Sequence, residues 1–266
     1  MECKCVRLLA GVILTAFFYG APPAFAQTAP SLGSAQSFAV LGGSTVTNTG
    51  PTTITGDLGV SPGSAVTGFP PGVVSGGAIH AADAVALAAQ NSVTTAYNGL
   101  ASQACTLDLT GQDLGGKTLT PGVYCFSSSA QLTGTLTLNA QGNAGAVFVF
   151  KIGSTLTTAS ASSVVMINGG SPCNVFWQVG SSATAGTTTS LIGNVLALTS
   201  ITLTTGVRMI GRALARNGAV TLDSNVVSNA ACSVPVPALP NALLIVLALG
   251  LAGLGFARLR RRALTA

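Results

Sequence analysis

The sequence predicts a mainly β fold in which short strands stack as a solenoid, with one long α-helix alongside. Strings in which threonine alternates with leucine recur at Gly134–Thr137, Ser154–Thr157, Ile201–Thr204 and Ala219–Leu222. Such alternation buries one face of a strand and leaves hydroxyl and methyl groups on the other. One stretch without proline, Ala78–Gln103, has apolar residues at intervals of three and four, as in a helix. In a long stretch with almost no charge, this recurring alternation suggests a surface rather than a pocket.

The first 26 residues have the features of a secretory signal peptide. Two basic residues precede an apolar run from Leu8 to Phe18, and Ala24-Phe25-Ala26 places small residues at the positions that signal peptidase reads. We expect cleavage before Gln27. The short apolar run and the good cleavage site favour this interpretation over a retained signal anchor.

Residues 234–266 read as a hydrophobic tail. Three prolines lead into an apolar run, Ala242–Ala257, which is followed by Arg258, Arg260, Arg261 and Arg262. A helix over this run rises roughly 24 Å, a marginal membrane span, and the arginines orient its C-terminus toward the cytoplasm.

The tail resembles the sorting signals that exosortase-type enzymes process in Gram-negative bacteria. It lacks a Pro-Glu-Pro triplet, and Val236-Pro237-Ala238-Leu239 is closer to the variant that begins Ile/Val-Pro-Thr-Leu. The resemblance implies a sorting enzyme as a partner and attachment to the membrane, at least transiently, through residues 242–257. A permanent single-span anchor is the alternative.

The predicted helix covers residues 78–103. Its apolar stripe is narrow and rich in alanine, so the helix can lie close to a flat sheet; the stripe consists of Ile79, Ala82, Ala86, Ala89, Val93, Ala96 and Leu100. Twenty-six helical residues rise roughly 39 Å, which corresponds to about eight stacked strands.

Apolar strands after Cys125 recur at the interval expected for solenoid coils. Those that begin at Ala146, Asn174, Asn194 and Arg212 are separated by 28, 20 and 18 residues, and a threonine-bearing strand follows each. Coils of this kind bury their faces on their neighbours. Two further segments before the helix, residues 44–49 and 52–57, have the same character. We therefore expect one domain, residues 27–233, whose solenoid is interrupted in sequence by the helix.

Charge and cysteine content limit the possible functions of this domain. It has five basic and five acidic residues, so its net charge is 5 − 5 = 0, and no basic patch is available for nucleic acid.

Four cysteines, an even number in an exported chain, indicate two disulfides, for which three pairings are possible. We favour Cys105–Cys125 and Cys173–Cys232. No C-x-x-C spacing occurs and His80 is the single histidine, so neither a metal nor a cofactor is expected.

Several longer strings resemble the microbial ice-binding proteins whose fold is a discontinuous right-handed β-solenoid with a helix alongside. They span nearly the whole domain in the order that this family has; they are Phe38–Gly50, Gly56–Gly63, Thr120–Tyr124, Val147–Gly153, Asn174–Gly180 and Gly211–Val220. The resemblance implies binding to ice through one flat solenoid face, and hence inhibition of ice growth and recrystallisation.

The resemblance also implies a loose Thr-Ala/Gly-x-Thr/Asn motif on the binding face. Thr184-Ala185-Gly186-Thr187 fits it fully, whereas the strings beginning at Thr158 and Thr205 depart at the fourth position, the latter because of Arg208. A long charged side chain would disturb a flat face. Together with the strand pattern, these observations predict the ice-binding residues Thr155, Thr157, Thr184, Thr187, Thr202, Thr204 and Thr221.

An enzyme is not expected, because the five aspartates are scattered singly and no paired carboxylates are evident. Arg208, Arg212 and Arg216 share parity along the chain and could line a groove, but we expect them to point outward on a side other than the binding face. The alternative function is that of a cell-surface adhesin or a structural protein of a biofilm matrix, which the tail and the nonionic, threonine-rich surface favour. We expect a monomer that is secreted or held at the cell surface of a Gram-negative bacterium, with the ice crystal as its main partner and no nucleic acid.

Overall fold

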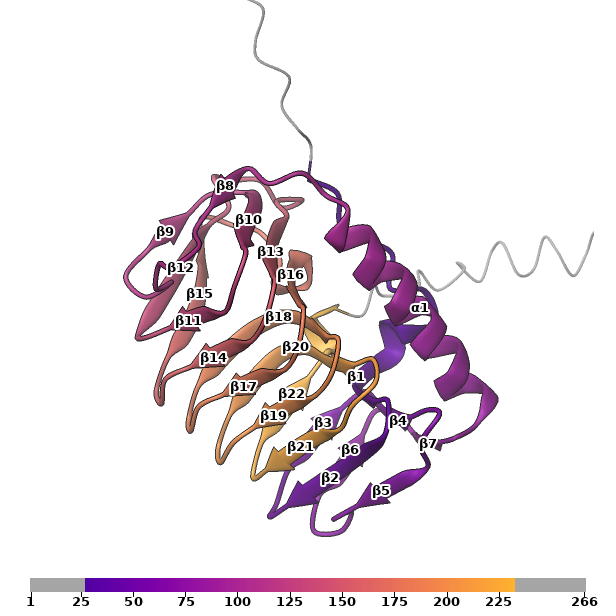
Figure 1. Ribbon diagram of the computed structural model, residues 1–266. Coiled ribbons are helices and arrows are strands. Elements are labelled where there is room, and N and C mark those ends of the chain that lie inside the picture. The colour runs from indigo at the N-terminus through magenta and orange to yellow at the C-terminus, as the bar shows by residue number, and fades with distance from the viewer. Residues whose placement is uncertain (1–26, 233–266) are drawn as a thin grey trace, which may run out of the picture.

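The computed structural model describes residues 27–232, so the predicted signal peptide and the predicted tail lie outside the described residues. Parallel strands are stacked into a solenoid, and one long helix runs along its side (Figure 1). The predicted fold class is confirmed. Within the described part of the chain, no helix is both long and apolar enough to cross a membrane.

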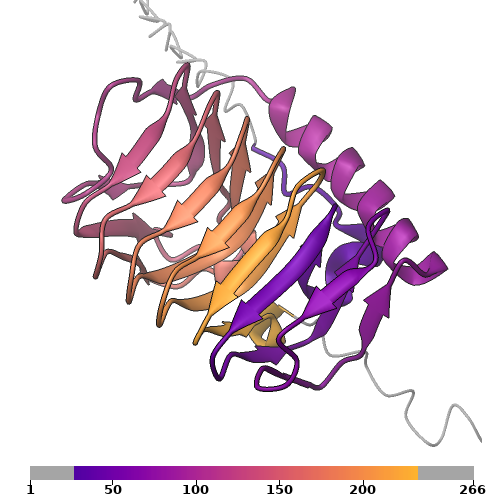
Figure 2. The ribbon, with the colours of Figure 1, turned by 60° about the horizontal axis from the view of Figure 1, so that its bottom comes forward.

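One side of the solenoid is a separate seven-stranded parallel sheet, which faces the viewer in Figure 2 and which we call the threonine face. Its strands, in spatial order, are β11 (Ala130–Leu132), β14 (Leu156–Thr158), β17 (Ala183–Ala185), β19 (Ile201–Leu203), β21 (Val220–Asp223), β2 (Thr45–Thr49) and β5 (Ala65–Thr67).

The second side lies under the helix, and we call it the helix side. Its strands are β8 (Leu107–Asp108), β10 (Gly122–Phe126), β13 (Phe148–Ile152), β16 (Val175–Val179), the second halves of β18 (Ser190–Ala197) and β20 (Arg208–Ala215), β1 (Phe38–Gly42), β4 (Asp57–Val60) and β7 (Ile79–Ala81).

The remaining strands form what we call the third side. They are β9 (Thr118–Leu119), β12 (Thr135–Asn139), β15 (Ser163–Ile167), the first halves of β18 and β20, β22 (Val226–Ser228), β3 (Thr53–Thr55) and β6 (Val73–Ser75).

Two glycines let β18 and β20 turn from the third side to the helix side. Gly193 and Gly211 are paired in register and have φ of 104° and 144°. A side chain at Gly211 would place its Cβ 1.9 Å from the carbonyl oxygen of Gly193, so only glycine fits between these stacked corners.

The order of the coils in space differs from their order in sequence. β1, β2 and β3 pair with β20, β21 and β22, so the N-terminal coils stack directly on the C-terminal coil. In both views the indigo strands therefore lie beside the yellow ones (Figures 1 and 2). The helix then carries the chain along the stack to β8 at the opposite end. This confirms that the helix interrupts the solenoid in sequence.

The helix, α1 (Ala84–Ala101), is shorter than the predicted range of 78–103. Its 18 residues rise roughly 27 Å. Residues Ile79–Ala81 instead form β7, which pairs with β4, and the Asp83 carboxylate then caps the helix by accepting a 2.8 Å hydrogen bond from the Ala86 amide. The stripe prediction failed at its N-terminal end because pairing with an open sheet edge outweighed helical periodicity.

The apolar core has two layers. The first fills the solenoid and includes a stack in which the rings of Phe150 and Trp177 lie 4.0 Å apart. The second lies between the solenoid and the predicted helix stripe from Ala86 to Leu100, which packs against residues such as Phe176 and Leu214. The buried face of the helix also includes Gln90 and Tyr97, whose side chains donate hydrogen bonds to the carbonyls of Ala215 and Val179.

Two disulfides tie down irregular segments, and both predicted pairings are confirmed. Cys105–Cys125 joins the segment after the helix to β10, with a Cα–Cα distance of 5.8 Å. Cys173–Cys232 joins η2 (Pro172–Asn174) to η3 (Ala230–Cys232) across 59 residues. A third 3-10 helix, η1 (Gly33–Ser37), precedes β1.

Candidate functional site

Six threonines form one continuous row along the threonine face, and we call this row the threonine ladder. Each is in register with the next on the neighbouring strand; in spatial order they are Thr157, Thr184, Thr202, Thr221, Thr47 and Thr67. Gln131 occupies the same register at one end. Because neighbouring strands lie about 4.8 Å apart, the ladder repeats its hydroxyl and methyl groups at that interval.

Buried neighbours fix the direction of each ladder side chain. On either side of Thr202, Ile201 and Leu203 point into the core, and Val220 and Leu222 do the same beside Thr221. Side chains alternate between the two faces of a strand, so the threonines must point outward. Their β-branched side chains have few rotamers, which keeps the row regular.

The residues that flank the ladder are mostly small. One flanking row consists of the residues two positions before Gln131 and before each ladder threonine. In spatial order they are Ser129, Thr155, Ser182, Ser200, Ala219, Thr45 and Ala65. The other flanking row consists of the residues two positions after Gln131 and the ladder threonines. In the coils from β11 to β2 they are Thr133, Ala159, Gly186, Thr204, Asp223 and Thr49. No aromatic side chain or long charged side chain interrupts these positions, so the threonine face is broad and even from β11 to β2. At the β5 end, the residue two positions after Thr67 is Phe69, a partly buried ring that packs against the core.

Four of the seven predicted site residues lie in the ladder: Thr157, Thr184, Thr202 and Thr221. Thr155 precedes β14, and its hydroxyl donates a 2.8 Å hydrogen bond to the Ser129 hydroxyl. This contact places Thr155 in the row that lies two positions before the ladder.

The other two predicted residues do not form a second ladder. The Thr204 hydroxyl donates a 2.7 Å hydrogen bond to the Ala185 carbonyl, so it serves the backbone at the edge of the face. Thr187 follows the end of β17, and its hydroxyl lies 3.5 Å from that of Thr204. The motif string beginning at Thr184 therefore turns off the sheet before its fourth residue.

Thr47 and Thr67 belong to the ladder but were missing from the predicted set. Both follow the same local pattern as the others, in Thr45-Val46-Thr47 and Ala65-Val66-Thr67. The alternation could have identified them. What it could not supply is the pairing of β2 with β21, which brings the N-terminal coils onto this face.

Arg208 does not disturb the threonine face, because it is exposed on another side of the solenoid, as expected for this arginine. It begins β20 and pairs with Ser190 and Val226 on the third side. The string Thr205–Arg208, of which Arg208 is the fourth residue, passes around a corner of the solenoid. Thr205 and Arg208 therefore lie on different sides.

One charged side chain, that of Asp223, lies at the edge of the threonine face. Asp223 is half-buried and pairs with Thr49, two positions after the ladder. Its carboxylate accepts hydrogen bonds from the hydroxyls of Thr205 and Ser224. Because both carboxylate oxygens of Asp223 accept these hydrogen bonds, the charged group is directed toward the turn that follows β21.

The other aspartates that the structure describes have local structural roles. Asp108 accepts a hydrogen bond from the Thr110 amide, and hydrogen bonding by Thr110 lowers the pKa of this carboxyl. Asp113 accepts bonds from the amides of Gly115 and Thr133. Among residues 27–232, no three histidine, cysteine or acidic side chains gather in a way that could hold a metal ion.

Comparison with known proteins identifies the family of this chain. A family model described as ice-binding-like matches residues 40–228. The chain belongs to the ice-binding-like family. It is 62% identical over 236 residues to an ice-binding protein of Nostoc sp. (strain HG1), an alignment that covers 86% of this chain and 87% of that protein.

Solved structures of ice-binding proteins have the same fold. The crystal structure of an ice-binding protein from an Antarctic biological consortium is 46% identical, with a TM-score of 0.74, and the match covers 85% of this chain and 96% of that one. That of the Antarctic ascomycete Antarctomyces psychrotrophicus is 42% identical, with a TM-score of 0.73, over 76% and 98% of the two chains. The family resemblance seen in the sequence is thus confirmed.

Proposed function

We propose that this chain binds ice through the threonine face and thereby inhibits ice growth and recrystallisation. The observation that carries the proposal is the threonine ladder, six threonines in register on one continuous parallel sheet. Membership in the ice-binding-like family supports it.

The chemistry of the ladder suits a crystalline water surface. Each threonine offers a methyl group that orders nearby water and a hydroxyl that joins the ordered water by hydrogen bonds. The repeat of about 4.8 Å between strands and of roughly 6.6 Å between alternate residues lies near oxygen spacings on ice planes. Individually weak contacts then act together, because a rigid face makes them all at once.

Adsorption of this kind explains the inhibition of growth. A molecule fixed on the surface forces the ice front to advance between adsorbed molecules as a curved surface, which grows less readily than a flat one. The same adsorption slows the transfer of water from small crystals to large ones.

The test is a bulky substitution at the centre of the ladder. We expect Thr202→Tyr to abolish most of the thermal hysteresis and recrystallisation inhibition of the folded protein. Thr53→Tyr is the matched control, because Thr53 is an exposed strand threonine on the third side. Full activity of folded Thr202→Tyr, or equal losses in both variants, would refute the assignment of the face.

We further propose that the chain is exported and held, at least transiently, at the cell surface through residues 234–266. Two disulfides in the domain support export, since such bonds persist in oxidising compartments. The intact mass of the protein recovered from cells and from medium tests both processing steps. A mass that retains residues 1–26 would contradict signal cleavage, and one that retains residues 234–266 would favour a permanent anchor over removal by a sorting enzyme.

A further inference from the structure

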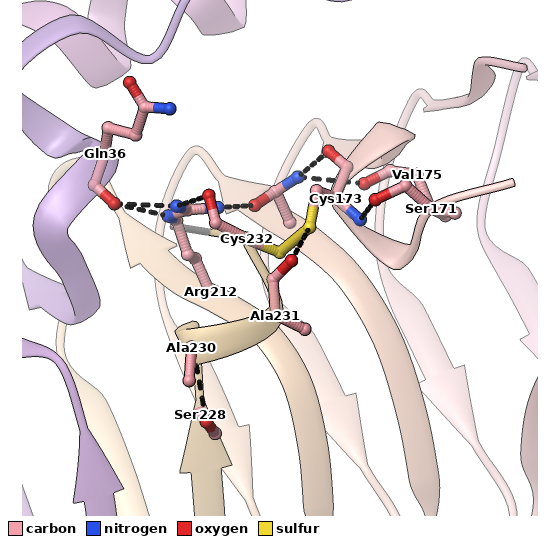
Figure 3. Close-up of a disulfide and its surroundings, with 10 residues drawn as sticks. Gln36, Ser171, Cys173, Val175, Arg212, Ser228, Ala230, Ala231 and Cys232 are labelled. Atoms are coloured by element: carbon pink, nitrogen blue, oxygen red, sulfur yellow. Dashed lines mark hydrogen bonds between the residues drawn. A yellow bond between two sulfur atoms is a disulfide. The ribbon is translucent and has the colours of Figure 1, made fainter. Parts of the chain in front are cut away.

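A buried arginine joins three distant segments on the edge of the helix side. Arg212, in β20, is only 2% exposed. Its Nε and Nη2 donate hydrogen bonds of 3.1 and 2.6 Å to the Gln36 carbonyl, and Nη1 donates one of 2.8 Å to Asn194 Oδ1. Nη2 also lies 3.5 Å from the Cys232 carbonyl, next to the Cys173–Cys232 disulfide (Figure 3). The prediction that Arg212 faces outward is therefore wrong.

The positive charge of Arg212 has no negative partner in the described structure. All its hydrogen-bond acceptors are neutral, and across residues 27–232 the one ion pair joins His80 to Asp83. Burial lowers the pKa of Arg212 to about 10, so the side chain stays protonated at neutral pH. Residues 233–266 contain no aspartate or glutamate, so side chains of that segment cannot supply the missing charge. The single acidic side chain of residues 1–26 is Glu2, which the expected cleavage before Gln27 removes. A buried charge without a counter-charge is costly.

The guanidinium also has a donor to spare. Of its five N–H groups, one on Nε, one on Nη1 and two on Nη2 are directed to the carbonyls of Gln36 and Cys232 and the side chain of Asn194. The second hydrogen of Nη1 has no acceptor in the described residues.

A cavity of about 250 Å³ adjoins this group. Its polar lining includes Arg212, Ser31 and Asn174, and its apolar lining includes Leu32 and Phe176. A fitting ligand would therefore carry one negative charge and a short apolar part. Inorganic phosphate fits less well, because it would bring a second charge and leave the apolar wall without contact.

We propose that this cavity binds a short-chain aliphatic monocarboxylate, whose carboxylate pairs with Arg212 and whose alkyl chain lies against Leu32 and Phe176. The site lies between the N-terminal segment, η2 and η3, so a bound carboxylate would hold together the two ends of the domain. It is separate from the threonine face.

The test uses sodium butyrate and the purified full-length chain, with sodium chloride at the same ionic strength as the reference. Because a ligand that binds only the folded state stabilises it by mass action, we expect the Tm to rise saturably, by roughly 5–10 °C at a concentration about 100 times Kd. Saturation-transfer NMR should show transfer from the protein to the alkyl protons of butyrate.

Three variants identify the site. Arg212→Gln should lose both signals, whereas Arg208→Gln, which removes the same charge at an exposed position on the third side, should keep them. If Arg212→Gln does not fold, Ala29→Phe serves instead, because it fills the cavity and leaves Arg212 in place. A Tm that rises equally in chloride and butyrate, or a butyrate effect that survives in Arg212→Gln or Ala29→Phe, would overturn the proposal.

Discussion

Thr47 and Thr221 lie side by side on the threonine face, 174 residues apart in the sequence, and the Thr47 hydroxyl donates a 3.4 Å hydrogen bond to the Thr221 hydroxyl. The contact marks the junction at which the N-terminal coils stack on the C-terminal coil. The ladder is therefore continuous across a break in chain order. Its length, and the number of contacts it can make at once, depend on this junction.

A substitution on the N-terminal side of the junction should consequently impair activity as strongly as one in the C-terminal half. We expect Thr47→Tyr to reduce thermal hysteresis about as much as Thr202→Tyr, with a change in unfolding free energy below about 0.5–1 kcal/mol. Thr55→Tyr, in the same coil but on the third side, is the control. Unimpaired activity of Thr47→Tyr would show that the face ends at β21.

Removing the charge at the edge of the face should increase activity. Asp223→Asn keeps the size of the side chain but removes its charge. The row two positions after the ladder then has no carboxylate between Thr204 and Thr49. We expect a larger thermal hysteresis, at a cost of about 1 kcal/mol for weaker bonds to Thr205 and Ser224. Asp57→Asn, on the helix side, removes an equal charge elsewhere and should leave activity unchanged. A decrease in activity for Asp223→Asn would mean that the carboxylate itself contributes to binding.

The two disulfides should contribute to stability through the loops they close. The disulfides close loops of 20 and 59 residues and so lower the conformational entropy of the unfolded chain. In the entropy model, each disulfide thereby raises the free energy of unfolding by about 3–4 kcal/mol. Urea unfolding of Cys173→Ala/Cys232→Ala and of Cys105→Ala/Cys125→Ala measures each contribution. Midpoints equal to that of the parent would show that the unfolded chain is already restricted at these places.

Acid should destabilise the domain in a defined pH range. Hydrogen bonds from the Ala86 amide and from His80 lower the pKa of Asp83, and bonds by Thr110 lower that of Asp108. The folded pKa values lie below the unfolded value of 3.8, so the unfolded state binds protons first. Stability is then retained above about pH 4 and lost as the pH falls through the folded pKa values.

Thermal unfolding between pH 7 and pH 2 checks this acid sensitivity, with Asp83→Asn as the comparison. The variant should start with a slightly lower Tm, because asparagine keeps the cap but loses the negative charge at the helix N-terminus and its pairing with His80, and it should lose less on acidification. An identical pH profile in both proteins would exclude a role for Asp83.

The local pattern was sufficient to predict most of the strands and the buried stripe of the helix from Ala86 to Leu100, whereas it left three disulfide pairings open. Alternating threonine and apolar residues determine which face of a strand is buried, and this depends on neighbouring residues alone. For that reason Thr157, Thr184, Thr202 and Thr221 could be proposed together before any contact was known. The same alternation indicated an extended surface of hydroxyl and methyl groups.

The tertiary structure decided where each strand belongs in the stack. Residues 79–81 became a strand because the edge of β4 offered backbone partners that local periodicity cannot reveal. Thr187 left the face where β17 turns, Arg208 passed to the third side, and Arg212 became buried beside Gln36 and Asn194. Thr47 joined the ladder through pairing with Thr221, 174 residues away, and Thr67 joined it through pairing with Thr47. Local patterns specify which way a side chain points on its own strand, whereas the position of that strand depends on hydrogen bonds and packing with segments distant in sequence.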